Sequence, residues 1–285
     1  MTRIVYVNGE YLPEEEARIS VFDRGFLFAD GVYEVSSVLR GRLIDNPGHM
    51  ARLHRSLTAL DMAAPATDTE LEAIQMSLIG RNQVDEGLVY LQVTRGAADR
   101  DFVYPEGVKP SLVMFTQSKP LLQSAQAERG ISVVTTEDIR WRRRDIKSVG
   151  LLAASMAKMI ARRAGADDAW MVESGKVTEG SSSNAYILTR EGTLVTRSLG
   201  HEILAGITRE AVLRLARTSS LQIEERPFSL AEAEEAAEAF ITSATTFVMP
   251  VVSIDGKPVG DGRPGPVTRQ LRELYITAAL EQTGR

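Results

Sequence analysis

The stretch RRDIKSVGLLAASMAKMIARRAG, residues 142–164, places Lys147 directly before a segment whose apolar residues recur at helical spacing. A lysine amine forms a Schiff base with an aldehyde cofactor or a carbonyl substrate when desolvation or a neighbouring cation lowers its pKa. Three arginines, Arg142–Arg144, provide such cations nearby. A solvated surface lysine would produce the same pattern, so the rest of the chain has to decide between the two interpretations.

Composition limits the class of protein. A chain of 285 residues with 44% hydrophobic residues can build a large core, and its length favours two lobes. The net charge of -5, with basic residues scattered along the chain, argues against nucleic-acid binding. No apolar run approaches the roughly 20 residues of a membrane span and no signal-peptide pattern is visible, so we expect a cytoplasmic protein without a membrane partner. Because the chain has no cysteine, thiolate metal sites are excluded, and no metal is expected.

The first 120 residues combine hairpins with amphipathic helices. Asn8-Gly9 lies between alternating apolar arms, which predicts a tight hairpin, and a second hairpin is expected to turn near Gly41. Asn46 is the expected N-cap of a helix with Pro47 in its first turn. Residues 1–120 are therefore expected to form an α+β lobe. Its further elements are a helix near 68–82 and strands over 87–96 and 111–117. An irregular linker is expected over 118–130.

Residues 121–285 predict a second lobe of sheet and helices. Helices are expected directly after Lys147, over 207–217, and over 229–238, where Ser229 and Glu232 have the spacing of a capping box. The mixture of both element types in both lobes indicates the α+β (mixed α/β) fold class. The strands expected in this lobe cover residues 131–139, 169–173, 184–188, 193–196 and 239–244, with a hairpin over 251–259.

A serine-rich segment follows one acidic residue in VTEGSSSNAYIL, residues 177–188. The carboxylate of Glu179 suits a protonated heteroaromatic nitrogen, and the loop after it offers hydroxyl groups and backbone amides to an anionic oxygen. An exposed serine-rich turn is the simpler explanation when this segment is taken alone.

A candidate phosphate site begins LAGITREAVLRLA, residues 204–216. Gly206 and Ile207 precede a helix with Thr208 as its expected N-cap, so free amides and the helix dipole would attract a phosphate. Arg52, expected on a helix of the first lobe, would neutralise that phosphate. Taken alone, the segment is more typical of a capped structural helix, and Arg52 is typical of the polar face of a helix.

The segments together resemble class IV of the pyridoxal-phosphate-dependent aminotransferases, the fold-type-IV group. The resemblance extends over essentially the whole chain. Within the family, the chain is most similar to the D-amino acid aminotransferase branch. It implies a smaller N-terminal α/β lobe over 1–120, a larger C-terminal cofactor-binding lobe with a barrel-like sheet over 121–285, and a homodimer. The motifs that carry it, in order, are DRGFLFADGVYE (23–34), HMARL (49–53), VTRG (93–96), DIKS (145–148), TEGSSSN (178–184), GITR (206–209) and FITSATT (240–246).

This resemblance implies amino transfer between a D-amino acid such as D-alanine and a 2-oxo acid such as 2-oxoglutarate, with pyridoxal 5'-phosphate as cofactor. Lys147 would bind the cofactor aldehyde and move the proton between substrate Cα and cofactor C4′. Glu179 would keep the pyridine nitrogen protonated. The cofactor-binding residues implied by the resemblance are Arg52, Lys147, Glu179, Ser182, Leu204, Ile207, Thr208, Ser243, Ala244 and Thr245. Ala244 stands where the family often has threonine, so the resemblance implies no hydroxyl contact from this position to the phosphate.

The substrate pocket departs from the family pattern. Tyr33 is the expected tyrosine of the pocket. Where the best-known D-amino acid aminotransferases carry an Arg-x-His pair that reaches across the dimer to the substrate carboxylate, this chain has Arg100 and Phe102. Arg24 or Arg95 is the expected alternative carboxylate ligand, and a looser carboxylate site would admit primary amines.

Other activities remain open within the same fold. They are branched-chain aminotransferase, (R)-selective amine transaminase and 4-amino-4-deoxychorismate lyase. Outside this class, the alternative is a non-catalytic phosphate-ligand-binding homologue, against which Lys147 and Glu179 both argue.

Overall fold

The computed structural model describes residues 2–284 and divides into two compact units. The first unit holds the chain up to Pro120, the short segment Ile146–Gly150 and the end of the chain from Leu280. The second holds Leu121–Asp145 and Leu151–Ala279. The segment that carries Lys147 is thus built into the first unit, although the chain on both sides of it belongs to the second.

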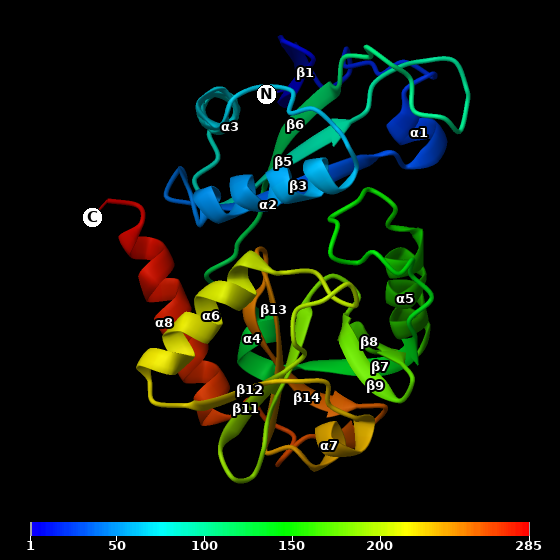
Figure 1. Cartoon of the computed structure of the whole chain (residues 1–285). Helices are drawn as coiled ribbons and strands as arrows, with labels where there is room; N and C mark the ends of the chain where they lie inside the picture. The colour runs from blue at the N-terminus through cyan, green and yellow to red at the C-terminus, as the bar shows by residue number, and fades with distance from the viewer. Residues whose placement is uncertain (1, 285) are drawn as a thin grey trace. The chain divides into compact units, whose positions relative to one another are not determined.

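The first unit is built on a six-stranded antiparallel sheet with the order β2-β1-β6-β5-β3-β4 (Figure 1). The expected hairpin at Asn8-Gly9 is confirmed, because both residues take the positive φ values that such a turn requires. The turn at Gly41 is confirmed too. The elements are β1 Ile4–Val7, β2 Glu10–Pro13, α1 Arg24–Phe28, β3 Gly31–Leu39, β4 Arg42–Leu43, α2 Asn46–Ala59, α3 Asp68–Arg81, β5 Gly87–Thr94 and β6 Ser111–Ser118.

Helices α2 and α3 cover this sheet, with α2 against β3 and α3 against β1 and β6. The core between them includes Leu53, Leu91 and Ile146, all buried. The expected N-cap of α2 is wrong by one residue, since Asp45 holds that position and Asn46 is already helical. The Asn46 side chain is buried and hydrogen-bonded to Ser36 and Gln75. These tertiary contacts use the side chain that was expected to cap the helix.

The second unit contains a nine-stranded mixed sheet with the order β12-β11-β10-β13-β14-β7-β8-β9, and β15 pairs with β14. The sheet curls on itself, because β9 at the end of this order also contacts β10, and the Gly180 amide donates to the Ser183 carbonyl at 2.7 Å. The elements are α4 Ala125–Arg129, β7 Ile131–Glu137, α5 Leu152–Arg163, β8 Asp168–Glu173, β9 Lys176–Gly180, β10 Asn184–Leu188, β11 Thr193–Thr196, α6 Ile207–Thr218, β12 Gln222–Glu225, α7 Leu230–Glu235, β13 Glu238–Ser243, β14 Phe247–Ile254, β15 Lys257–Pro258 and α8 Pro266–Glu281.

The α+β class with a barrel-like C-terminal sheet is confirmed, and so is the capping box at Ser229. The linker, expected to be irregular, contains the short helix α4, capped by Ser124. Glu179 lies on β9, a strand that was not expected from the sequence. Helix α8 went unpredicted. Within residues 2–284, none of the helices has the length and apolar character to cross a membrane.

Candidate functional site

Lys147 is positioned by backbone pairing with β3. The Tyr33 amide donates to the Lys147 carbonyl at 3.0 Å, and the Val149 amide donates to the Gly31 carbonyl at 3.0 Å. Ile146 anchors the segment in the core, and the hydroxyl of Ser56 accepts the Lys147 amide at 3.3 Å. The chain around the lysine therefore extends the sheet like a short additional strand, which holds the Lys147 backbone in place.

The Lys147 side chain points to an aromatic stack. Its Nζ lies 4.1 Å from the centroid of the Tyr33 ring, within the range of a cation–π contact. Tyr33 stacks on Tyr90 at 5.5 Å between centroids, and Tyr90 stacks on Phe115 at 4.7 Å. Two residues that the sequence assigns to catalysis and to the substrate pocket thus lie together in the first unit.

Arg52 belongs to a buried charge cluster in the same unit. Its Nε and Nη2 donate to the two carboxylate oxygens of Glu34 at 2.8 and 2.7 Å, and His49 Nδ1 lies 2.7 Å from Glu34 Oε2. Burial raises the pKa of Glu34, but the charge and hydrogen bonds of Arg52, together with His49, outweigh it and hold this pKa at about 2. The carboxylate fixes the guanidinium plane on α2 in one orientation.

The expected carboxylate ligands divide into two groups. Arg24 and Arg95 are buried and both bind Asp30, each through its Nε at 2.8 Å. Arg100 is exposed, and its guanidinium carbon lies over the rings of Phe28 and Phe102 at 5.3 and 5.6 Å. Of the three arginines, Arg100 is the one whose charge faces solvent.

Glu179 lies in the second unit, buried on β9. Arg140 Nη1 donates to its Oε1 at 2.5 Å, and Asn184 Nδ2 and the Leu204 amide donate to its Oε2 at 3.0 and 3.2 Å. Burial raises the pKa of Glu179, and Arg140 opposes this by charge and hydrogen bonding. Since an ionised carboxylate accepts at about four lone-pair positions, these three bonds leave capacity for a further donor.

The first turn of α6 is uncapped by any side chain. The expected N-cap Thr208 is wrong, because Gly206 holds that position in an extended conformation and Thr208 is buried one residue inside the helix. A Cβ on Gly206 would lie 2.1 Å from Asn184 Oδ1, so the close approach of β10 requires glycine here. The amides of this turn remain suited to an anion.

Asn184 connects these features. It pairs with Thr242 near the end of β13, and its side chain donates to Glu179 and to the Leu204 carbonyl. Ser243 is the last residue of β13, and Ala244 and Thr245 follow in the turn after it; Ser243 Oγ lies 2.7 Å from Thr246 Oγ1. Asn184 thus links Glu179 and Leu204, just before the α6 N-terminus, to the end of β13 and the turn after it. Ser182, in contrast, is exposed in the β9–β10 loop.

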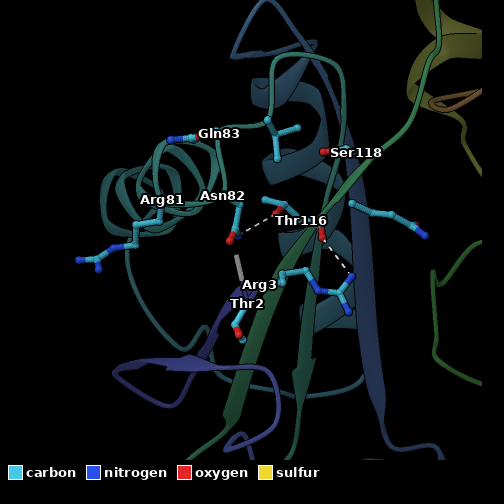
Figure 2. Close-up of a pocket in the computed structure, with 9 residues that line it drawn as sticks. Thr2, Arg3, Arg81, Asn82, Gln83, Thr116 and Ser118 are labelled. Carbon is cyan, nitrogen blue, oxygen red and sulfur yellow. Dashed lines mark hydrogen bonds between the residues drawn. The ribbon is translucent and has the colours of Figure 1, made fainter.

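A separate hollow of about 440 Å³ lies in the first unit, lined by residues that include Arg3, Arg81 and Asn82 (Figure 2). The amide of Asn82 is already bonded to Ile4 and Thr116, and Arg81 points away from the other lining residues. The hollow contains none of the expected site residues and is a structural junction between α3, β1 and β6.

Residues 31–254 match the family model described as amino-transferase class IV. The chain belongs to the class IV aminotransferases. It is 37% identical over 272 residues to a D-alanine aminotransferase of Staphylococcus aureus (strain MSSA476), covering 95% of this chain and 96% of the relative. It is 38% identical over 283 residues to a D-alanine aminotransferase of Bacillus licheniformis, covering 99% of both chains.

Solved structures agree on the aminotransferase fold. A branched-chain amino acid aminotransferase of T.th., solved with pyridoxamine 5'-phosphate, has a TM-score of 0.91 at 26% identity, covering 98% of this chain and 94% of that one. The Escherichia coli branched-chain amino acid aminotransferase also has a TM-score of 0.91, at 23% identity and with 98% and 95% coverage, which shows the fold alone.

Three residues beside Glu179 in this class IV aminotransferase were absent from the expected site. Asn184 ends the TEGSSSN motif, and its position was the available signal. Asp138 and Arg140 lie in the segment that joins β7 to the lysine. Arg140 begins the basic run RWRRR, residues 140–144, whose composition alone is typical of a solvated loop.

Proposed function

We propose that this protein transfers an amino group between a D-amino acid such as D-alanine and a 2-oxo acid such as 2-oxoglutarate, with pyridoxal 5'-phosphate bound through Lys147. The proposal rests on one observation above the others: Lys147 is held on β3 with its amine beside Tyr33, in an aminotransferase that is 37–38% identical to D-alanine aminotransferases over nearly its full length. The assignment of cofactor-binding residues is part of the proposal.

The donor groups fit this cofactor. The uncapped first turn of α6, with Ile207 and Thr208, suits the phosphate, and Arg52 supplies a positive charge whose orientation Glu34 fixes. Glu179 has remaining acceptor capacity for a pyridinium N–H. The Lys147 amine suits the aldehyde.

Bound pyridoxal phosphate supplies an aldehyde that takes up the amino group and a ring that withdraws electrons from the substrate Cα. With the cofactor bound, Lys147 would be the base that moves a proton from the substrate Cα to C4′, and the pairing of its backbone with β3 fixes the point from which its amine reaches the pocket. Glu179 would hold the proton on the ring nitrogen. Tyr33, stacked on Tyr90, fixes the wall beside the amine and offers its hydroxyl to a substrate carboxylate.

The proposal includes a homodimer and a cytoplasmic location. Support for the dimer comes from a continuous apolar face on α5, where Leu152, Met156, Met159 and Ile160 are 75%, 48%, 43% and 41% exposed. Phe102 and Val103, next to Arg100, are 77% and 73% exposed and suit burial against a second copy. Arg100 would bind the substrate carboxylate, with Phe102 replacing the usual histidine and Arg24 as a further carboxylate candidate.

Borohydride reduction of the purified holoprotein tests the cofactor assignment. Peptide mass mapping should place the phosphopyridoxyl group on Lys147, and a label on Lys158 or Lys176 would disprove it. A panel of D-amino acids, branched-chain L-amino acids and (R)-amines then tests the substrate. We expect D-alanine with 2-oxoglutarate to react fastest, whereas preference for branched-chain L-amino acids would favour the activity of the structural neighbours.

A further inference from the structure

Arg140 connects two buried carboxylates from different parts of the second unit. Its Nη1 donates to Glu179 on β9, while its Nε and Nη2 donate to the two oxygens of Asp138, just after β7, at 2.9 and 2.7 Å. The side chains of Asp138 and Glu179 are 0% and 5% exposed, and that of Arg140 is 16% exposed. One guanidinium thus neutralises both acids and fixes the distance between them.

Asp138 is itself held rigidly. Thr178 Oγ1 donates to its Oδ2 at 2.6 Å, and Arg144 Nε lies 3.5 Å from the same oxygen. Arg144 is in turn fixed by Glu173 at 2.9 Å. Because Thr178 precedes Glu179 on β9, the same strand positions both carboxylates that Arg140 binds.

Arg140 is the positive charge that favours the ionised form of Glu179. Asp138 and Arg140 are the ionised groups that act on Glu179 most directly, and Asp138 is negative. Burial and Asp138 therefore both favour the protonated form of Glu179, and Arg140 is the group that opposes them. Asn184 and the Leu204 amide orient the carboxylate without contributing a net charge.

We propose that Arg140, anchored by Asp138, is a positioning residue that keeps Glu179 ionised and oriented as the acceptor for a ring nitrogen proton. The role of Glu179 in this statement rests on the proposed function. The effect of Arg140 on the Glu179 carboxylate does not, because it exists in the protein without cofactor.

The titration of Glu179 in the apoprotein tests the proposal. Glutamate labelled with ¹³C at Cδ would be followed by NMR against pH, and the Glu179 signal would be assigned by its loss in Glu179→Gln. In Arg140→Gln we expect its midpoint about one to three pH units above that of the wild type. Arg140→Lys should restore part of this difference. Arg143→Gln, which removes a neighbouring arginine paired with the partly exposed Asp145, should leave the midpoint unchanged.

An unchanged midpoint in Arg140→Gln would overturn the proposal. If that variant does not fold, the double variant Asp138→Asn/Arg140→Gln removes both charges together, and a midpoint at or below the wild-type value there would overturn it instead. Loading with ¹⁵N-labelled pyridoxal phosphate supplies the second readout: we expect a protonated ring nitrogen in the wild type and an unprotonated one in Arg140→Gln, and a protonated nitrogen in both would also overturn the proposal. Wild-type protein that takes up no pyridoxal phosphate would refute the proposed function while leaving the Glu179 titration as a valid test of Arg140.

Discussion

Two buried glutamate–arginine pairs, one in each unit, differ in the charge of the groups that donate to the carboxylate. In the first unit, Glu34 receives two hydrogen bonds from Arg52 and one contact from His49. In the second unit, Glu179 also receives three bonds, but only one comes from an arginine, Arg140, which Asp138 shares; the other two come from the neutral Asn184 amide and Leu204 backbone amide. The pKa of Glu34 is held at about 2, whereas burial leaves the pKa of Glu179 above its usual range.

The difference indicates two uses of the same pair of side chains. A carboxylate that receives two bonds from one arginine, with a histidine beside it, stays ionised at ordinary pH values and serves to orient that arginine. A buried carboxylate whose arginine is shared with a second acid, and whose pKa is raised, is poised to exchange a hydrogen bond with a ligand. We therefore assign Glu34 to the support of Arg52, and Glu179 to direct contact with the proposed cofactor.

The largest expected effect breaks the first pair. Glu34→Gln leaves the buried Arg52 without its counter-charge, which should lower the free energy of unfolding by about 3–5 kcal/mol. Urea denaturation of the apoprotein measures it. The matched control is Glu14→Gln, which removes an exposed partner of Arg3 and should cost at most about 1 kcal/mol. Equal losses in both variants would contradict the assignment.

The next effect concerns the second pair. Glu179→Gln replaces a carboxylate by a neutral amide of the same shape, so we expect cofactor to remain bound. The half-reaction with D-alanine should slow by roughly ten- to thousand-fold, because a preorganised charge contact of a few kcal/mol is lost. Stopped-flow absorbance of the bound cofactor measures this rate. A wild-type rate would show that Glu179 is as structural as Glu34.

A third prediction extends the comparison to Arg100, which has an exposed charge over aromatic rings. If it binds the substrate carboxylate, Arg100→Ala removes a contact of about 1.5–3 kcal/mol and should weaken D-alanine binding while leaving an (R)-amine little affected. Phe102→His should favour D-alanine over the amine. Steady-state kinetics with both substrates decide this, and equal effects on the two would direct attention to Tyr33, Arg24 and Arg95.

The smallest expected effect is the change in the free energy of unfolding per pH unit. The pKa of Glu34 is lowered from 4.5 to about 2 in the folded protein, so the unfolded chain binds its proton more readily. Its contribution to stability is complete above about 4.5 and is lost as pH falls toward 2.

The slope in that window should be at most about 1.4 kcal/mol per pH unit, and it should be missing in Glu34→Gln. The raised pKa of Glu179 gives the opposite sign, since its contribution is present at low pH and is lost as pH rises through the folded value. Denaturation curves at a series of pH values compare the two variants with the wild type.

Elements with local signals were predictable from the sequence. The Asn8-Gly9 hairpin and the Ser229 capping box depend on residues adjacent in the chain, and both are present. Strand β9 was not predictable in this way, because Glu179 lies in a stretch with loop composition that becomes a strand through pairing with β8. Helix α8 did carry a signal, since its buried Thr268, Leu271, Tyr275 and Ala279 recur at helical spacing.

The site residues also divide into those that stand in sequence motifs and those that only the fold brings together. Lys147, Glu179 and the start of α6 stand in motifs of the class IV aminotransferases, so the resemblance named them. The surroundings of Glu179 depend on contacts between residues distant in the chain: Arg140 is 39 residues from Glu179, and Asp138 is 40 from Thr178. Local patterns carry no information about such pairs, and only the fold brings them together.

The segment Ile146–Gly150 has a consequence for how this chain could be divided. The backbone passes between the two units four times, at residues 120/121, 145/146, 150/151 and 279/280. A fragment that ends at Pro120 would keep all six strands of its sheet, yet it would lack Ile146 in its core and the backbone partner of Tyr33. Cleavage at that point would therefore produce two incomplete halves, and reconstitution from separately expressed fragments would require the lysine segment of one to add itself to the β3 edge of the other.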